Sequence, residues 1–120
     1  MNTLTRRILT KVLHLLIVIV IVGMPLETTS AKTVYATTTF VVTKTADTND
    51  GACDADCSLR EAIIAANATP GDDIITLPSG TYTLSIAGTD EDLAATGDLD
   101  IASNLTINGA GARTTIVNGG

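Results

Sequence analysis

Two cysteines and a cluster of acids give residues 53–67, CDADCSLREAIIAAN, more potential for chemistry than any other segment. Cys53 and Cys57 are separated by three residues, so they could form a structural disulfide, remain free thiols, or belong to a metal or redox centre. A zinc site needs four ligands, and the only histidine, His14, lies in an apolar N-terminal segment. Redox-active pairs have two intervening residues rather than three. If the protein is exported, a disulfide is the favoured interpretation.

The acids around these cysteines are candidate calcium ligands, because calcium binds hard oxygen atoms. Residues 47–51, DTNDG, resemble the start of an EF-hand loop, but the glycine comes one residue early and no glutamate occupies the twelfth position. Acids in such a loop can also stabilise the positive end of a following helix. Calcium is therefore a secondary interpretation, and its candidate ligands are Asp47, Asn49, Asp50, Asp54 and Asp56. We expect no other metal and no cofactor.

Acids farther along the chain could supply the paired carboxylates that cleave polysaccharides. Such a site needs acids that converge from several segments, usually with a basic residue, and Arg113 is the only base after residue 73. Arg60 is expected to form an ion pair with nearby loop acids. We therefore expect no catalytic residue in this chain, although the acids considered are Asp72, Asp73, Asp90, Glu91, Asp92, Asp98 and Asp100.

A short helix is predicted over 58–67, where it would cover the first coil, and the cysteine pair would fix its start. Ser58 and Glu61 have the Ser-x-x-Glu spacing of a capping box, in which each side chain binds the backbone amide of the other residue. The sequence TPGD at 69–72 ends the helix. One apolar face at helical spacing would pack on the rest of the protein, and it consists of Leu59, Ala62, Ile63 and Ala66.

After this helix the hydrophobic period changes from 3.6 to 2, which predicts short strands. Ile107-Asn-Gly109 is echoed by Val117-Asn-Gly119, and glycine and asparagine recur at the turns. Short strands with a repeat near twenty residues favour a parallel β-helix, in which stacked coils bury inward-facing aliphatic side chains. Strands are expected at 37–45, 73–78, 80–86, 98–101, 104–108 and 114–118.

The N-terminal residues predict export. Arg6, Arg7 and Lys11 precede or begin a nearly all-aliphatic run over 8–24, which is the pattern of a secretory signal peptide. The uninterrupted apolar core is shorter than the roughly 20 residues of a membrane span. We predict a signal peptide over 1–36 that contacts the membrane only through 8–24. An uncleaved signal anchor is the alternative.

Two details of the leader stay open. Residues 5–11 resemble a twin-arginine signal, although the aliphatic core favours the general secretory route. Cleavage could follow Ala36, after Thr33-Val-Tyr, or Ala31, after Thr29-Ser.

Removal of the leader changes the charge balance. The whole chain has a formal charge of −6, whereas residues 37–120 retain three basic residues against twelve acids, a net charge of −9. Nucleic-acid binding is therefore not expected, because the phosphate backbone requires clustered Lys and Arg.

The segment Cys57-Ser-Leu-Arg-Glu-Ala-Ile63 is similar to the N-terminal module named for its CSLREA signature, found in exported bacterial repeat proteins. The similarity extends to 40–51 and to Gly80-Thr-Tyr-Thr-Leu84. Residues 104–111, NLTINGAG, resemble early coils of right-handed, pectate-lyase-like β-helices. The resemblance implies a secreted or surface-attached β-helix protein and carries over no catalytic residue.

These observations predict three parts: the leader over 1–36, an N-terminal cap over 37–73, and the first β-helix coils over 74–120. Such a coil series would continue, so we expect a truncated chain that either extends further or associates edge to edge. The expected function is a non-enzymatic surface scaffold that contacts a polysaccharide or a protein. The alternative is the N-terminal piece of a β-helix polysaccharide lyase or hydrolase whose active site lies beyond this chain.

Overall fold

The structure of the chain is a computed structural model, which describes residues 2–22 and 31–120. It divides into two units, Met1–Lys32 and Thr33–Gly120. The first unit contains helix α1, Thr3–Val22. Within the described residues, no helix combines the length and apolar character needed to cross a membrane. Residues 23 and 24 of the membrane-contacting segment predicted at 8–24 lie outside the described residues. So do Thr29 and Ser30 of the alternative cleavage site at Ala31.

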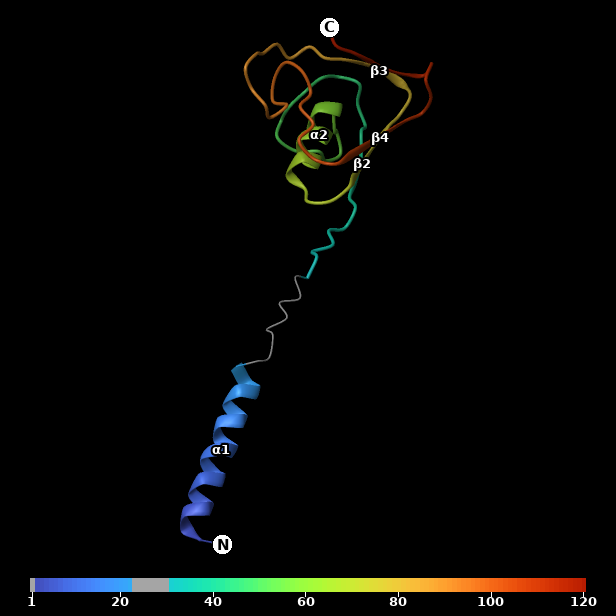
Figure 1. The fold of residues 1–120 in the computed structure, drawn as a ribbon. Helices are drawn as coiled ribbons and strands as arrows, with labels where there is room; N and C mark the ends of the chain where they lie inside the picture. The colour runs from blue at the N-terminus through green and yellow to red at the C-terminus, as the bar shows by residue number, and fades with distance from the viewer. Residues whose placement is uncertain (1, 23–30) are drawn as a thin grey trace. The chain divides into compact units, whose positions relative to one another are not determined.

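The second unit contains one helix and five short strands (Figure 1). Helix α2 spans Leu59–Ala68, and its apolar face lies against β1 and β2. The predicted face residues Leu59, Ala62, Ile63 and Ala66 are all buried. The strands are β1 (Thr39–Val41), β2 (Asp73–Leu77), β3 (Gly80–Thr83), β4 (Leu105–Gly109) and β5 (Thr115–Asn118).

The strands form two small parallel sheets, one in the order β1-β2-β4 and one containing β3 and β5. Thr39 pairs with Ile74, and Ile75 pairs with Ile107. In the other sheet, Tyr82 pairs with Val117. Residues 105–118 thus run alongside residues 73–83, and the core lies between these strands and α2.

The prediction of a right-handed parallel β-helix is wrong for this chain. The described residues form sheets of three and two strands and contain no solenoid and no closed sheet. The repeat fails over residues 84–104. Ser85 and Ile86 donate their backbone N–H groups to the Asp47 carboxylate instead of extending β3, and the strand predicted at 98–101 is irregular.

Candidate functional site

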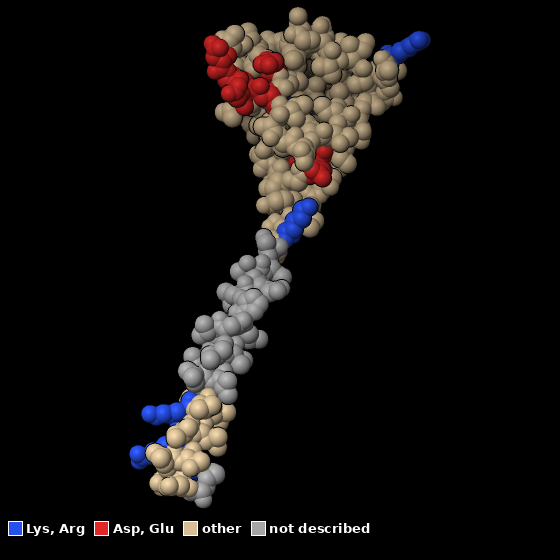
Figure 2. All heavy atoms as spheres, in the orientation of Figure 1, with Lys and Arg blue, Asp and Glu red and all other residues tan. Residues whose placement is uncertain are grey.

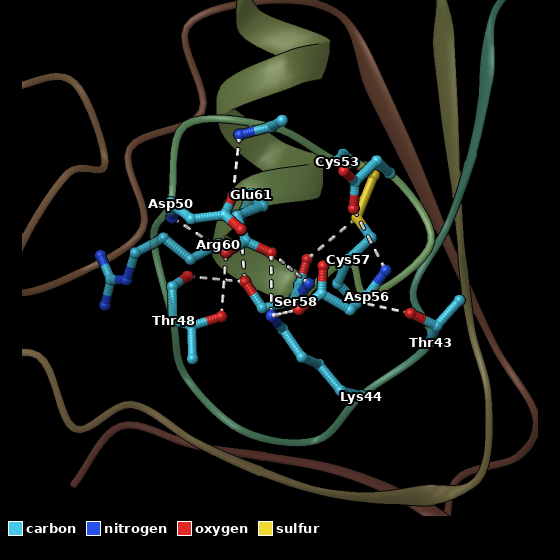
Figure 3. Close-up of polar contacts among 12 residues, drawn as sticks. Thr43, Lys44, Thr48, Asp50, Cys53, Asp56, Cys57, Ser58, Arg60 and Glu61 are labelled. Atoms are coloured by element: carbon cyan, nitrogen blue, oxygen red, sulfur yellow. Dashed lines mark hydrogen bonds and ion pairs between the residues drawn. A yellow bond between two sulfur atoms is a disulfide. The ribbon is translucent and has the colours of Figure 1, made fainter.

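The disulfide between Cys53 and Cys57 is confirmed, with an S–S distance of 2.04 Å (Figure 3). Cys57 is fully buried, and its carbonyl accepts hydrogen bonds from the backbone N–H groups of Thr43 (2.9 Å) and Lys44 (3.3 Å). The disulfide therefore closes a small loop beside the residues that follow β1. Neither sulfur is available as a free thiol in this state.

Ser58 and Glu61 form a capping box at the start of α2. The Glu61 backbone N–H donates to Ser58 Oγ (3.1 Å), and the Ser58 backbone N–H donates to Glu61 Oε2 (2.7 Å). The hydroxyl of Ser58 also donates to the Thr48 carbonyl (2.7 Å). The cap therefore joins the acidic loop to the helix as well as satisfying the helix terminus.

Glu61 receives further donors on its other carboxylate oxygen. Thr48 Oγ1 (2.9 Å) and the Asp50 backbone N–H (3.1 Å) both donate to Oε1 (Figure 3). Burial by itself raises the pKa of Glu61, but the hydrogen bonds from Ser58, Thr48 and Asp50 outweigh it, so the pKa lies below its ordinary value. Glu61 is thus held as an anion that organises residues 48–58.

Lys44 lies at the edge of this cluster. Its Nζ is 2.9 Å from Asp56 Oδ2 and 3.6 Å from Glu61 Oε2. The hydrogen bond to Asp56 raises the pKa of Lys44 and, in turn, lowers the pKa of Asp56. Because Asp56 is exposed, this pair contributes little to stability.

Arg60 is fully buried and pairs with Asp47 in a two-point contact. Its Nε donates to Asp47 Oδ1 (2.7 Å), and its Nη2 donates to Oδ2 (3.1 Å). Asp47 Oδ2 also accepts the N–H groups of Ser85 (2.7 Å) and Ile86 (2.9 Å). Burial raises the pKa of Asp47, but the bonds from Arg60, Ile86 and Ser85 outweigh this effect, so its pKa is lowered.

The remaining donors of Arg60 hold the loop that replaces the expected coil. Nη1 donates to the carbonyls of Ala94 (2.8 Å) and Asp98 (3.1 Å), and Nη2 donates to that of Gly97 (2.8 Å). Ala94 is fully buried at a φ of 57°, a conformation that is unusual for alanine. Arg60 therefore joins three segments: residue 47, the helix, and the loop over 94–98.

The calcium candidates do not converge on one point. Asp47 binds Arg60, and Asp56 binds Lys44. Asp50 and Asp54 accept backbone N–H groups two residues ahead, and the Asn49 amide donates to the Ala95 carbonyl. Over residues 2–22 and 31–120, no group of three or more His, Cys, Asp or Glu side chains could hold a metal ion.

The acids considered for polysaccharide cleavage also have separate environments. Asp72 accepts from Asn104 (2.9 Å), Asp100 accepts the Ala94 N–H (3.1 Å), and Glu91 accepts the Thr96 N–H (2.8 Å). The bond from Thr96 lowers the pKa of Glu91. Asp73 is buried at the start of β2. Asp90, Asp92 and Asp98 are exposed.

Two open hollows flank the 84–102 region. One has a volume of about 370 Å³ and is lined by uncharged residues of 84–89 with Gly97 and Gly119. The other, of about 350 Å³, contains Asp92 as its single ionisable side chain. Ligand sites typically combine an apolar pocket with several converging polar groups, and neither hollow has that combination.

Asn67 has a structural role that the sequence did not indicate. Its amide nitrogen donates to the Asp100 carbonyl (2.7 Å), and its amide oxygen accepts the Ala102 N–H (2.9 Å). These two bonds fix the segment predicted as a strand at 98–101. The available clue was an asparagine in the last turn of a helix, where its side chain readily binds backbone groups.

Comparisons of the chain with family models, with curated proteins and with solved structures found no match.

Proposed function

We propose that this chain is an exported, non-enzymatic structural module that carries the CSLREA signature. The observation that supports this proposal is how the signature residues are used. Cys57 is in a disulfide, Ser58 caps α2, Arg60 pairs with Asp47, and Glu61 binds three backbone or hydroxyl donors. All four are buried, so none of these polar groups can contact a substrate.

In this proposal the signature residues stabilise the fold by joining helix α2 to the loops around it. Catalytic groups need access to a reacting atom and unsatisfied hydrogen-bonding capacity aimed at it. The side chains of Arg60 and Glu61 instead form hydrogen bonds with the loops over 47–50 and 94–98. The surface of residues 37–120 is acidic, because twelve acids face three basic residues in the sequence. The visible face in Figure 2 carries gathered acidic side chains and few basic ones on the second unit.

The leader is the second part of the proposal, and it rests on Arg6, Arg7 and Lys11 before the aliphatic run. The test is expression of the full chain with a C-terminal epitope tag in a bacterium, followed by cell fractionation and intact-mass measurement. We expect the tagged chain outside the cytoplasm and shorter than the 12.3 kDa translation product plus tag.

Two variants sharpen this test. Val12→Arg combined with Leu13→Arg places charges in the aliphatic core and should retain the full-length chain in the cytoplasm. Asn2→Arg adds a charge before the core, where basic residues are normal, and should be exported like the native chain. A native chain that stays cytoplasmic at full length would overturn the proposal.

A further inference from the structure

Asp73, the first residue of β2, has an unsatisfied carboxylate oxygen inside the fold. Its exposed fraction is 1%, and its Oδ1 accepts the Thr38 backbone N–H at 3.0 Å. Its Oδ2 is buried and has no hydrogen-bond partner among the described residues. None of the ion pairs found in that part of the chain includes Asp73. Buried polar atoms nearly always have a partner, because an unpaired one costs free energy.

The carboxylate faces the segment where the second unit begins. Thr38 contacts β2 in both directions, because its N–H binds Asp73 and its carbonyl accepts the Ile74 N–H at 2.8 Å. The preceding residues, 31–37, are exposed and have no regular secondary structure. Two of them are large and apolar: Val34 is 88% exposed and Tyr35 is 57% exposed. These residues lie outside the hydrophobic core, and exposed segments of this kind are preferred sites of proteolytic cleavage.

We propose that cleavage of the Ala36–Thr37 peptide bond creates an α-ammonium group at Thr37 that binds the Asp73 carboxylate. Water is the co-reactant: its oxygen adds to the Ala36 carbonyl carbon as the C–N bond breaks. Ala36 leaves as a carboxylate, and the Thr37 nitrogen takes up protons to become –NH₃⁺. This inference rests on the leader in the proposed function, and it selects one of the two cleavage sites.

Distance supports the pairing. The Thr37 nitrogen is one residue before the Thr38 nitrogen, and a residue in an extended chain advances about 3.3 Å. Since Thr38 N is already 3.0 Å from Oδ1, a free Thr37 terminus needs only rotation about its own backbone to approach the carboxylate. An ammonium group provides both the missing donor and the counter-charge for a buried carboxylate.

Gly71 shows how closely the leader passes over this site. A Cβ built on Gly71 would lie 2.7 Å from the Ala36 carbonyl oxygen, so the absence of a side chain there lets the segment lie against the entrance to β2. Cleavage after Ala36 would remove that contact and leave open space beside the new terminus. Cleavage after Ala31 would instead keep Val34 and Tyr35 on the folded unit.

The first experiment identifies the N-terminus of the exported full-length gene product by intact mass and N-terminal sequencing. We expect a chain that begins at Thr37. A chain that begins at Lys32, or one that is exported without cleavage, would overturn this inference and leave the export proposal intact. Cytoplasmic retention at full length would instead overturn the proposed leader.

The second experiment measures the pKa of the α-amino group, from the pH dependence of its acylation in the N-terminal peptide. An ordinary α-amino pKa is about 7.7–8.0, and a close opposite charge raises it by about one unit or more. We expect such a rise in the native protein and its loss in Asp73→Asn. Asp72→Asn, an exposed neighbour, is the matched control and should retain the rise.

A second variant covers the case in which Asp73→Asn does not fold. Insertion of one glycine between Ala36 and Thr37 leaves every side chain of the folded unit unchanged and moves the ammonium group one residue away from Asp73. Its α-amino pKa should return to the ordinary range. A native α-amino group with an ordinary pKa would overturn the pairing even if cleavage occurs at Ala36.

Discussion

The side chain of Arg60 donates hydrogen bonds to several segments of the second unit at once. Its guanidinium group binds the Asp47 carboxylate and three backbone carbonyls, and its side chain is 0% exposed. A planar group with five donors suits this task, whereas a lysine ammonium cannot make the same two-point contact. The residue therefore couples helix α2 to two loops that are distant in sequence.

Removal of this group should strongly destabilise the protein. Arg60→Met leaves the buried Asp47 carboxylate and three carbonyls without their partner, and breaking a buried ion pair in this way typically costs about 3–5 kcal/mol. Urea unfolding of the purified chain, followed by circular dichroism, measures the loss. Arg113→Met, at an exposed position, should change the free energy of unfolding by less than about 0.5 kcal/mol. Equal effects of the two substitutions would refute the role given to Arg60.

The pKa values of Asp47 and Glu61 predict the acid sensitivity of the fold. Both are lower in the folded protein than in the unfolded chain, so each carboxylate stabilises the fold above its unfolded pKa of about 4. That stability is lost as the pH falls through the lower, folded-state values. We expect a melting temperature that is nearly constant from about pH 7 to 5 and falls steeply below about pH 4.

Glu61→Gln tests the assignment. Because glutamine does not titrate, the variant should have a lower melting temperature at pH 7 and a shallower decline below pH 4. Asp92→Asn, which alters an exposed acid, should reproduce the native profile. Native and Glu61→Gln profiles of the same slope would mean that other carboxylates control acid unfolding.

At the scale of elements, α2 begins where the disulfide ends. The loop closed by Cys53 and Cys57 is short, since the two cysteines are separated by four positions in sequence. The chain-entropy contribution of such a small loop is at the low end of the usual range. The disulfide nonetheless holds Cys57, whose carbonyl binds the two N–H groups after β1, at the entrance to the helix.

Reduction should therefore weaken the protein without unfolding it. We expect dithiothreitol to lower the free energy of unfolding by about 2 kcal/mol, measured by urea titration with and without the reductant. The double variant Cys53→Ala/Cys57→Ala provides the control, because its stability should not respond to dithiothreitol. A native protein equally insensitive to the reductant would show that the disulfide adds no stability.

Local signals in the sequence predicted most elements but not their assembly. The capping box and apolar spacing placed a helix at 58–67, and α2 spans Leu59–Ala68. Alternating aliphatic residues likewise marked the segments that form β2, β4 and β5. Such patterns report on one segment at a time.

The strand predictions are wrong where a side chain that is distant in sequence binds backbone groups that would otherwise pair with a neighbouring strand. The strand predicted to reach residue 86 ends at Thr83, because Asp47 captures the N–H groups of Ser85 and Ile86. The strand predicted at 98–101 is held instead by Arg60 and Asn67. The local sequence predicts an ion pair of Arg60 with a loop acid, and Asp47 is that acid. The three carbonyl partners of Arg60 lie 34 to 38 residues away and have no local signature.

At the scale of the whole molecule, each of the two sheets ends in a strand whose outer edge has no partner strand among the described residues. β4 and β5 are the last strands of their sheets, and they carry partly exposed apolar side chains: Ile107 at 42%, Ile116 at 49% and Val117 at 51%. Open edges with apolar residues promote strand pairing between molecules. We expect a second copy of the chain to cover this edge.

Sedimentation velocity over a range of protein concentrations tests this expectation. The purified protein should associate as its concentration rises, and Ile107→Lys or Ile116→Lys should reduce association by placing a charge on the edge strand. Ile101→Lys is the matched control, because Ile101 is similarly exposed, at 52%, but lies outside the strands. A native protein that remains monomeric throughout would contradict the prediction.

The spacing of the contacts around Asp47 and Arg60 also determines the order in which the chain can acquire structure. The hydrogen bond of Thr38 cannot form before Asp73 is present, and those of Asp47 cannot form before Ser85 and Ile86 are present. Arg60 likewise needs residues 94–98 for its carbonyl contacts. Contacts of such long sequence separation form slowly, because a large loop must close first. During synthesis these partners are absent until about residue 98 has been made, so we expect the first half of the second unit to fold only after that point. If the proposed leader directs export, this delay would let a translocation channel receive an extended chain instead of a folded one.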